Sequence, residues 1–195
     1  MPLVYGCKYR WVIAVCLMAG VLSPAWSGTL NRGLGPEPDS LDIHQAQGLA
    51  AVNLLRDLRE GLVTFDMSGE TVPGQAVSWE VLDGGTRYRF NLRDEARWSN
   101  GDPVTAADFV RAWRRAFSSD QPAATAGLLK SVHNAGAILS GDRPVEELGI
   151  QAVSSRVLDI TLVEPAPWII EILAHPVSYP LHEQLIDDPR NAPVN

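Results

Sequence analysis

The sequence WSNGDPVTAADFV at residues 98–110 decides how the centre of this 195-residue chain folds. Asn100-Gly101 is a turn pair. Thr105 is a favourable helix N-cap, and Asp108, three residues later, suits the positive end of a helix. The next aromatic side chains recur at four-residue intervals, which places them on one stripe of a helix: Phe109, Trp113 and Phe117. The stretch therefore predicts a helix that begins after Thr105 and turns this stripe inward.

Two hairpins flank this helix in the sequence. Strands are predicted at 77–82 and 87–93, around Asp83-Gly84-Gly85, and at 148–153 and 157–163, around Ser154-Ser155. In the second of these strands apolar side chains alternate with polar ones, and the apolar face comprises Tyr88, Phe90 and Leu92. Trp79 can pack on Phe90 across the first hairpin. Hairpins mixed with helices predict an α+β fold with a largely antiparallel sheet.

The remaining segments have weaker patterns. Apolar spacing predicts a helix at about 49–60, ended by Gly61, and a longer one at about 124–139 with Leu128, Val132, Ala135 and Leu139 inward. Short strands are expected at 30–33 and 62–65. Pro167 suits the first turn of a short helix at 168–174. The tail from Asp187 has no periodic pattern.

The N-terminus has the order of a secretory signal peptide. Lys8 and Arg10 precede an uncharged, mostly apolar run at 11–22, and a small-residue cleavage site follows, with Ser27 as the last residue removed. A membrane anchor is the alternative, but a span needs roughly 20 apolar residues. The only cysteines, Cys7 and Cys16, lie inside this segment. The mature chain would therefore form no disulfide.

Composition and motifs exclude several functions. The net charge of −7 argues against binding to nucleic acid, whose phosphates need a basic surface. His175 and His182 do not have the spacing of a metal site, because Pro176 and Pro180 interrupt any shared helix, so structural roles are favoured for both. No Gly-x-Ser-x-Gly elbow is present in the sequence. A secreted hydrolase is therefore disfavoured, and the chain is predicted not to be an enzyme, with no cofactor or metal.

The stretch from Ser78 to Trp113 closely resembles the solute-binding proteins of oligopeptide, dipeptide and nickel ABC importers. The segment EPDSLD at 37–42 and the segment RDLREGL at 56–62 match the opening and the first helix of that family. The segments at 148–150 and 162–167 are most similar to its oligopeptide-binding branch. The resemblance implies part of a type II periplasmic-binding-protein-like fold, with the second lobe absent. It also implies that the protein closes on its ligand by a hinge.

The same resemblance implies a ligand-binding segment. Gln47, Gly48 and Leu49 match the residues that line the ligand cleft beside the first helix. The oligopeptide binder has an acidic residue in place of Gln47, so the ligand of this chain is expected to differ in charge. Ala123 stands where that branch has a tyrosine that touches peptide. From the residues alone, an ordinary lead-in to a helix is the favoured interpretation of 47–49.

The resemblance further implies an organisation and a function. Residues 1–27 would be the signal, 28–60 the start of the first lobe, 61–182 a small accessory domain, and 183–195 a return toward the first lobe. The expected function is capture of oligopeptides in the periplasm by a monomer that delivers them to a membrane permease. The chain is expected to be either a truncated form or an incomplete sequence. A secreted stand-alone binding or scaffold module remains the alternative, and a small metal complex in place of peptide remains open.

Overall fold

A computed structural model describes residues 31, 33, 35–118, 120 and 122–185. The chain divides into two units, 1–33 and 34–195, and the fold described below is that of the second. The predicted signal peptide lies outside the described residues. Of the strand expected at 30–33, Asn31 and Gly33 are not in a strand, and Leu30 and Arg32 are outside the described residues. Within the described ranges, no helix combines the length and apolarity that crossing a bilayer requires.

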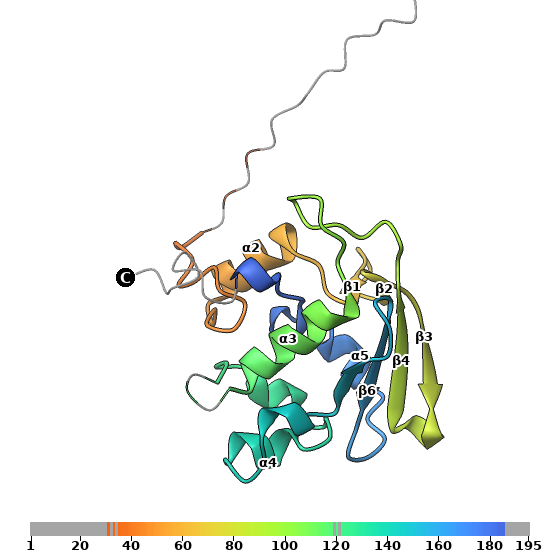
Figure 1. Cartoon of the computed structure of the whole chain (residues 1–195). Coiled ribbons are helices and arrows are strands. Elements are labelled where there is room, and N and C mark those ends of the chain that lie inside the picture. Colours follow the sequence, from red (N-terminus) through yellow and green to blue (C-terminus); the bar gives the residue numbers. More distant parts are fainter. Residues whose placement is uncertain (1–30, 32, 34, 119, 121, 186–195) are drawn as a thin grey trace, which may run out of the picture. The chain divides into compact units, whose positions relative to one another are not determined.

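The second unit mixes short helices with two antiparallel sheets (Figure 1). One sheet has two strands, β1 and β2. The other has four, in the order β3-β4-β6-β5. The elements are α2 (Leu49–Leu58), β1 (Val63–Phe65), β2 (Thr71–Pro73), β3 (Ala76–Leu82), β4 (Arg87–Leu92), α3 (Ala106–Ala116), α4 (Ala135–Leu139), β5 (Ile150–Ala152), β6 (Val157–Thr161) and α5 (Ile169–Ile172). The predicted α+β class is confirmed.

Both predicted hairpins form. β3 pairs with β4 across the turn at Asp83–Gly85, and β5 pairs with β6. The two hairpins join through β4 and β6, in a register that places Phe90 opposite Leu158. The inward residues of β4 are at most 4% exposed, as the alternation predicts, and Trp79 lies 6.1 Å from Phe90, centroid to centroid.

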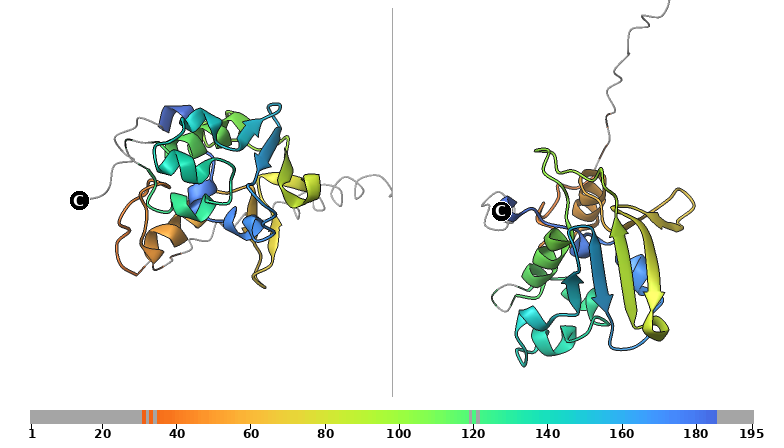
Figure 2. Two further views of the ribbon diagram at one scale, coloured as in Figure 1. Left: turned by 90° about the horizontal axis from the view of Figure 1, so that it is seen from below. Right: turned by 45° about the vertical axis from the view of Figure 1, so that its right-hand side comes forward.

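α3 begins where the sequence predicts. Thr105 is its N-cap and forms a capping box with Asp108, whose carboxylate accepts the Thr105 backbone N–H at 2.8 Å. The aromatic stripe is buried, because Phe109, Trp113 and Phe117 are each at most 1% exposed. α3 packs against β5, and Figure 2 shows α3 and α4 along one side of the four-stranded sheet.

The long helix predicted at 124–139 is wrong. The chain instead forms a 3-10 turn at Ala126–Leu129 and the five-residue α4. Between them the backbone pairs with the sheet: the His133 N–H donates to Thr161 O at 2.9 Å, and His133 O accepts from Gly149 at 2.9 Å. A continuous helix would use these groups internally. Leu128 and Leu139, expected inward, are 42% and 41% exposed.

Gly61 has a different role from the predicted helix stop. α2 ends earlier, at Leu58, and the backbone of its C-cap Arg59 is extended, with a φ of −137° and a ψ of 164°. A Cβ at Gly61 would lie 2.7 Å from the carbonyl oxygen of Leu173 and 2.7 Å from Tyr179 Cε1. Glycine is therefore required here by close packing of another segment rather than by the end of the helix.

Candidate functional site

The three residues that match a ligand-binding segment lie at the start of α2. Gly48 is the N-cap of the helix, Gln47 precedes it on the surface, and Leu49 is 74% exposed. The Asp39 carboxylate accepts hydrogen bonds from the backbone N–H groups of Gln47 and Gly48, at 2.9 and 3.0 Å. These bonds, the Gln47 bond first, hold the pKa of Asp39 below its ordinary value. The segment is thus exposed, and its backbone is fixed by a carboxylate.

A small hollow adjoins this segment. Its volume is about 320 Å³, and its walls come from the loop before α2 and the first turn of α2: Pro36, Glu37, Asp39, Gly48, Leu49, Ala50 and Asn53. The structure therefore brings Gly48 and Leu49 to one concave surface, whereas Gln47 does not line it. A side chain at position 48 would crowd this wall, since its Cβ would lie 3.1 Å from Asp39 Oδ1.

A buried polar cluster lies in the loop that leads to the segment. Asp42 and His44 are 3% and 1% exposed, and both contact Arg115 of α3. The Arg115 guanidinium donates to Asp42 Oδ1 at 2.8 Å and to Asp42 Oδ2 at 2.5 Å, which is the two-bond geometry that arginine forms with carboxylates. A third contact joins Arg115 to His44 Nδ1 at 2.6 Å.

The charges of this cluster follow from its contacts. Burial raises the pKa of Asp42, but the hydrogen bonds and charge of Arg115 outweigh burial and hold that pKa below its ordinary value. Burial, and then the Arg115 charge, lower the pKa of His44 to about 3. His44 is therefore neutral near pH 7. Because its Nδ1 accepts from Arg115, its Nε2 carries the proton, and no acceptor for it lies in the described part of the chain.

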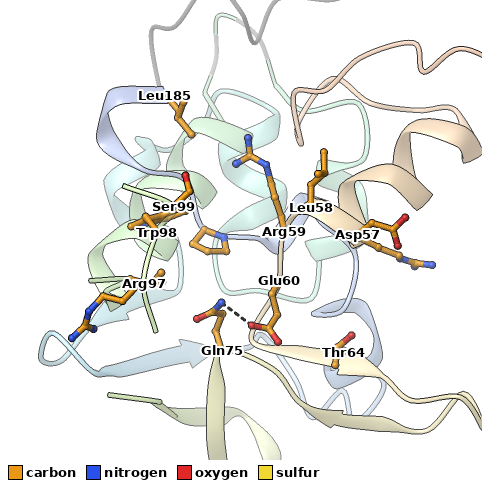
Figure 3. A pocket seen from close by; sticks show the side chains of 13 residues that line it. Asp57, Leu58, Arg59, Glu60, Thr64, Gln75, Arg97, Trp98, Ser99 and Leu185 are labelled. Carbon is orange, nitrogen blue, oxygen red and sulfur yellow. Dashed lines mark hydrogen bonds between the residues drawn. The ribbon is translucent and has the colours of Figure 1, made fainter. Parts of the chain in front are cut away.

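A larger hollow, of about 570 Å³, lies at the opposite end of α2 (Figure 3). Its Glu60 carboxylate accepts from Gln75 Nε2 at 2.8 Å and from Arg93 at 2.5 Å, so it already has partners. The walls also include arginines and the Trp98 indole, and none of the residues 47–49 lines this hollow. The lining residues are Arg56, Asp57, Leu58, Arg59, Glu60, Thr64, Gln75, Arg97, Trp98, Ser99, Val104, Pro180 and Leu185. This hollow is larger, but it is separate from the predicted segment.

The two histidines considered as metal ligands have structural partners. His175 Nδ1 accepts the Val177 N–H at 3.2 Å, and burial lowers the pKa of His175. His182 lies 3.0 Å from Asp102 and meets Trp98 edge to face at 5.5 Å. Across the residues that the structure describes, no group of three or more His, Cys, Asp or Glu side chains is placed to hold a metal ion.

Sequence reasoning missed the residues that hold the segment in place. Asp39 and Asp42 enter the sequence analysis only as part of the EPDSLD motif at 37–42, and no sequence pattern singles out Arg115. Asp42 and Arg115 are 73 positions apart, and no periodic pattern links them. The available signal is a local one: Asp and Ser cluster in a turn-forming stretch before a helix, where their side chains commonly bond nearby backbone N–H groups. Ala123, matched to a ligand-contacting position, is only 5% exposed.

Comparisons with known proteins agree on one group of relatives. A family model described as bacterial extracellular solute-binding proteins, family 5 Middle, matches residues 70–194. The chain is 39% identical to the periplasmic oligopeptide-binding protein OppA of Escherichia coli over 177 residues, 90% of this chain and 32% of that protein. It is 41% identical to the probable deoxycholate-binding periplasmic protein YgiS of Escherichia coli over 77% of this chain and 28% of that protein.

A solved structure is similar as well. The crystal structure of Haemophilus influenzae OppA in complex with the peptide RPPGFSPFR superimposes with a TM-score of 0.75 at 37% identity, over 79% of this chain and 30% of that one. The chain therefore spans about a third or less of the length of each of these relatives.

Proposed function

Because the chain belongs to the bacterial extracellular solute-binding proteins of family 5, we propose that it is the extracytoplasmic solute-binding component of an ABC importer and captures oligopeptides for delivery to the permease. The observation that carries the proposal is the similarity, at a TM-score of 0.75 and 37% identity, to a relative that was crystallised with a nine-residue peptide. Recognition and release are the function, and no bond in the ligand is broken.

The ligand contact on this chain is assigned to Gln47, Gly48 and Leu49. Three properties support the assignment: the segment is exposed, its backbone is fixed by Asp39, and two of its residues line a hollow. Peptides in extended form are commonly held through backbone hydrogen bonds, which need a backbone already in place. Gln47 is uncharged, so it offers no counter-charge to a basic ligand group.

The organisation of the chain is proposed in the same way. Residues 61–182, which carry both hairpins, α3 and α4, form the accessory domain of the family. Residues 28–60 begin the first lobe, and 183–195 return toward it. The protein acts as a monomer in the periplasm after export, and its partners are a peptide and a membrane permease rather than nucleic acid.

Site-specific photo-cross-linking tests both the function and the site. Leu49 and Leu58 are matched positions, because both are leucines of α2 and are 74% and 63% exposed. p-Benzoylphenylalanine is introduced at one position or the other, and each protein is irradiated with a biotinylated pool of tripeptides to pentapeptides. We expect labelling from position 49 that unlabelled peptide suppresses, and background labelling from position 58.

The other outcomes each reject part of the proposal. Labelling from position 58 alone would move the site to the larger hollow, which Leu58 lines. If deoxycholate suppresses labelling from position 49 and unlabelled peptide does not, the ligand is an amphipathic acid rather than a peptide. Background labelling from both positions would reject peptide capture by this chain.

A further inference from the structure

The loop at residues 39–48 is shaped by hydrogen bonds to its own backbone. Asp39 accepts the N–H groups of Gln47 and Gly48. The carbonyl oxygen of Asp42 accepts the N–H groups of Gln45 and Ala46, at 3.0 and 2.9 Å. Four consecutive amides, 45–48, are therefore fixed by two aspartates of the same loop. These bonds set the shape of the loop, but by themselves they do not fix its place on the rest of the molecule.

Arg115 provides that placement. It lies on α3, whose apolar stripe is buried in the core, with Trp113 0% exposed. From there its guanidinium holds both carboxylate oxygens of Asp42 and the imidazole of His44. The His44 carbonyl oxygen accepts the Ala124 N–H at 3.2 Å, beyond the C-terminal end of α3. The loop is thus joined to a helix that packs in the core and to the segment that follows this helix.

We propose that Arg115 is a positioning residue for ligand binding: acting through Asp42 and His44, it fixes the loop at 39–48 and so orients Gln47–Leu49. This inference rests on the proposed function for its link to the ligand. Arginine suits the role because its planar guanidinium presents several N–H donors in a fixed fork, which can bind a carboxylate with two bonds and still reach a third acceptor. A lysine carries the charge but not the fork.

Amide hydrogen exchange separates positioning from general stability. The variant R115K is compared with R111K, a matched control: Arg111 lies on the same helix, is similarly half-buried, and pairs at 2.7 Å with Asp108, a carboxylate outside the loop. Exchange reports local opening segment by segment. We expect R115K to raise exchange at amides 45–48 at least tenfold while β4 and β6 change less than threefold, and R111K to leave amides 45–48 unchanged.

The cross-linking yield from position 49 gives the link to ligand. With the same peptide pool, R115K should lower the yield at least fivefold and R111K should retain it. If the parent protein gives no labelling, the proposed function fails, whereas the exchange result still decides whether Arg115 positions the loop. If the parent labels and R115K labels equally well, the loop is not positioned by Arg115 for binding.

Two results overturn the positioning role itself. One is unchanged exchange at amides 45–48 in R115K, and the other is an equal rise in exchange throughout the sheet. Should R115K fail to fold, Asp42→Glu replaces it, because it keeps the charge and displaces the carboxylate by one methylene, and the same local pattern is expected. If neither variant folds, the Asp42–Arg115 pair is required for folding of the whole domain, and the proposal is rejected.

Discussion

The core beneath α3 and the loop at 39–48 both contain buried side chains, but the side chains are of different chemical kinds. Beneath α3 the largest fully buried side chains are apolar, with Trp113, Phe109 and Phe90 at 0% exposure. In the loop the buried side chains include Ser40, Asp42 and His44, at 1%, 3% and 1%. The core is held by non-directional packing, whereas the loop is held by a few directional, charge-assisted hydrogen bonds.

The difference teaches where each region can tolerate change. Apolar packing distributes its energy over many contacts, so the cost of a substitution scales with the volume removed. A buried ion pair concentrates its energy in one partner, and removing that partner leaves an uncompensated charge. In the core, the loss of stability should therefore depend on the volume of side chain removed. In the loop, replacing a single charged atom group should be enough to cause a large loss.

Trp113→Ala is expected to give the largest effect. The side chain is fully buried, and its Nε1 donates to Ser178 O at 3.0 Å. Truncation leaves a cavity and an unpaired carbonyl, and the free energy of unfolding should fall by about 4 kcal/mol. Urea denaturation measures this change. Trp168→Ala is the control, because Trp168 is 54% exposed and should cost about 1 kcal/mol or less. Similar losses in both variants would refute the assignment of Trp113 to the core.

Asp42→Asn tests the loop by removing one charge without changing size. The substitution leaves the largely buried Arg115 guanidinium without its carboxylate partner. The free energy of unfolding should therefore fall by about 3 kcal/mol. Asp83→Asn is the matched control: Asp83 pairs with Arg87 at 2.8 Å, but its side chain is 61% exposed, and such pairs contribute roughly 0–1 kcal/mol. Thermal denaturation measures the fall in melting temperature of each variant. Equally small falls would show that the Asp42–Arg115 pair contributes no more than an exposed ion pair.

The pH dependence of stability should reveal His44. Its pKa in the folded protein, about 3, lies below its ordinary value of 6.5. As the pH falls below 6.5, the unfolded chain binds a proton that the folded chain does not. The contribution of His44 to the free energy of unfolding is therefore complete above pH 6.5 and decreases as the pH falls toward the pKa of the folded protein. Between pH 7 and about pH 4.5 the loss should be about 2 kcal/mol. The lowered pKa of Asp42 acts in the same direction, but only below its ordinary 3.8.

His44→Asn isolates this contribution. Asparagine keeps an acceptor for Arg115 but does not titrate, so the variant should lose about 2 kcal/mol less than the parent over the same pH range. Subtraction removes the contribution of His175, whose pKa burial also lowers. Urea denaturation at several pH values is the measurement. Parallel curves for parent and variant would show that His44 is not held neutral by the fold.

Gly61→Ala should give the smallest of these effects. A new Cβ would lie 2.7 Å from Leu173 O, which is backbone and cannot swing away. The expected cost is about 1–2 kcal/mol. Gly127→Ala is the control, since nothing lies within 4 Å of its new Cβ, and the change should be within about 0.5 kcal/mol. If Gly61→Ala were neutral by urea denaturation, the contact between the end of α2 and the segment at 173–179 would be looser than the structure shows.

The sequence predicted those parts of the fold that local patterns specify. The alternation in β4, the cap at Thr105 and the stripe on α3 all formed as expected, because strand and helix periods place side chains on a face whatever else the chain does. The prediction of a helix at 124–139 was wrong because the backbone of His133 donates a hydrogen bond to Thr161 and accepts one from Gly149. Those partners lie many residues away, so no local count of apolar spacing could reveal that the backbone would be used by the sheet.

For the candidate site, the sequence by itself determined which family the segment at 47–49 resembles and that it precedes a helix. Only the tertiary structure decided that Asp39 fixes the backbone of this segment, that Asp42 and His44 are buried, and that Arg115 reaches both from α3. The physical reason is distance along the chain. Periodicity and capping act within a turn or two, whereas a charge-assisted contact between residues 73 positions apart exists only after the core has placed both of them.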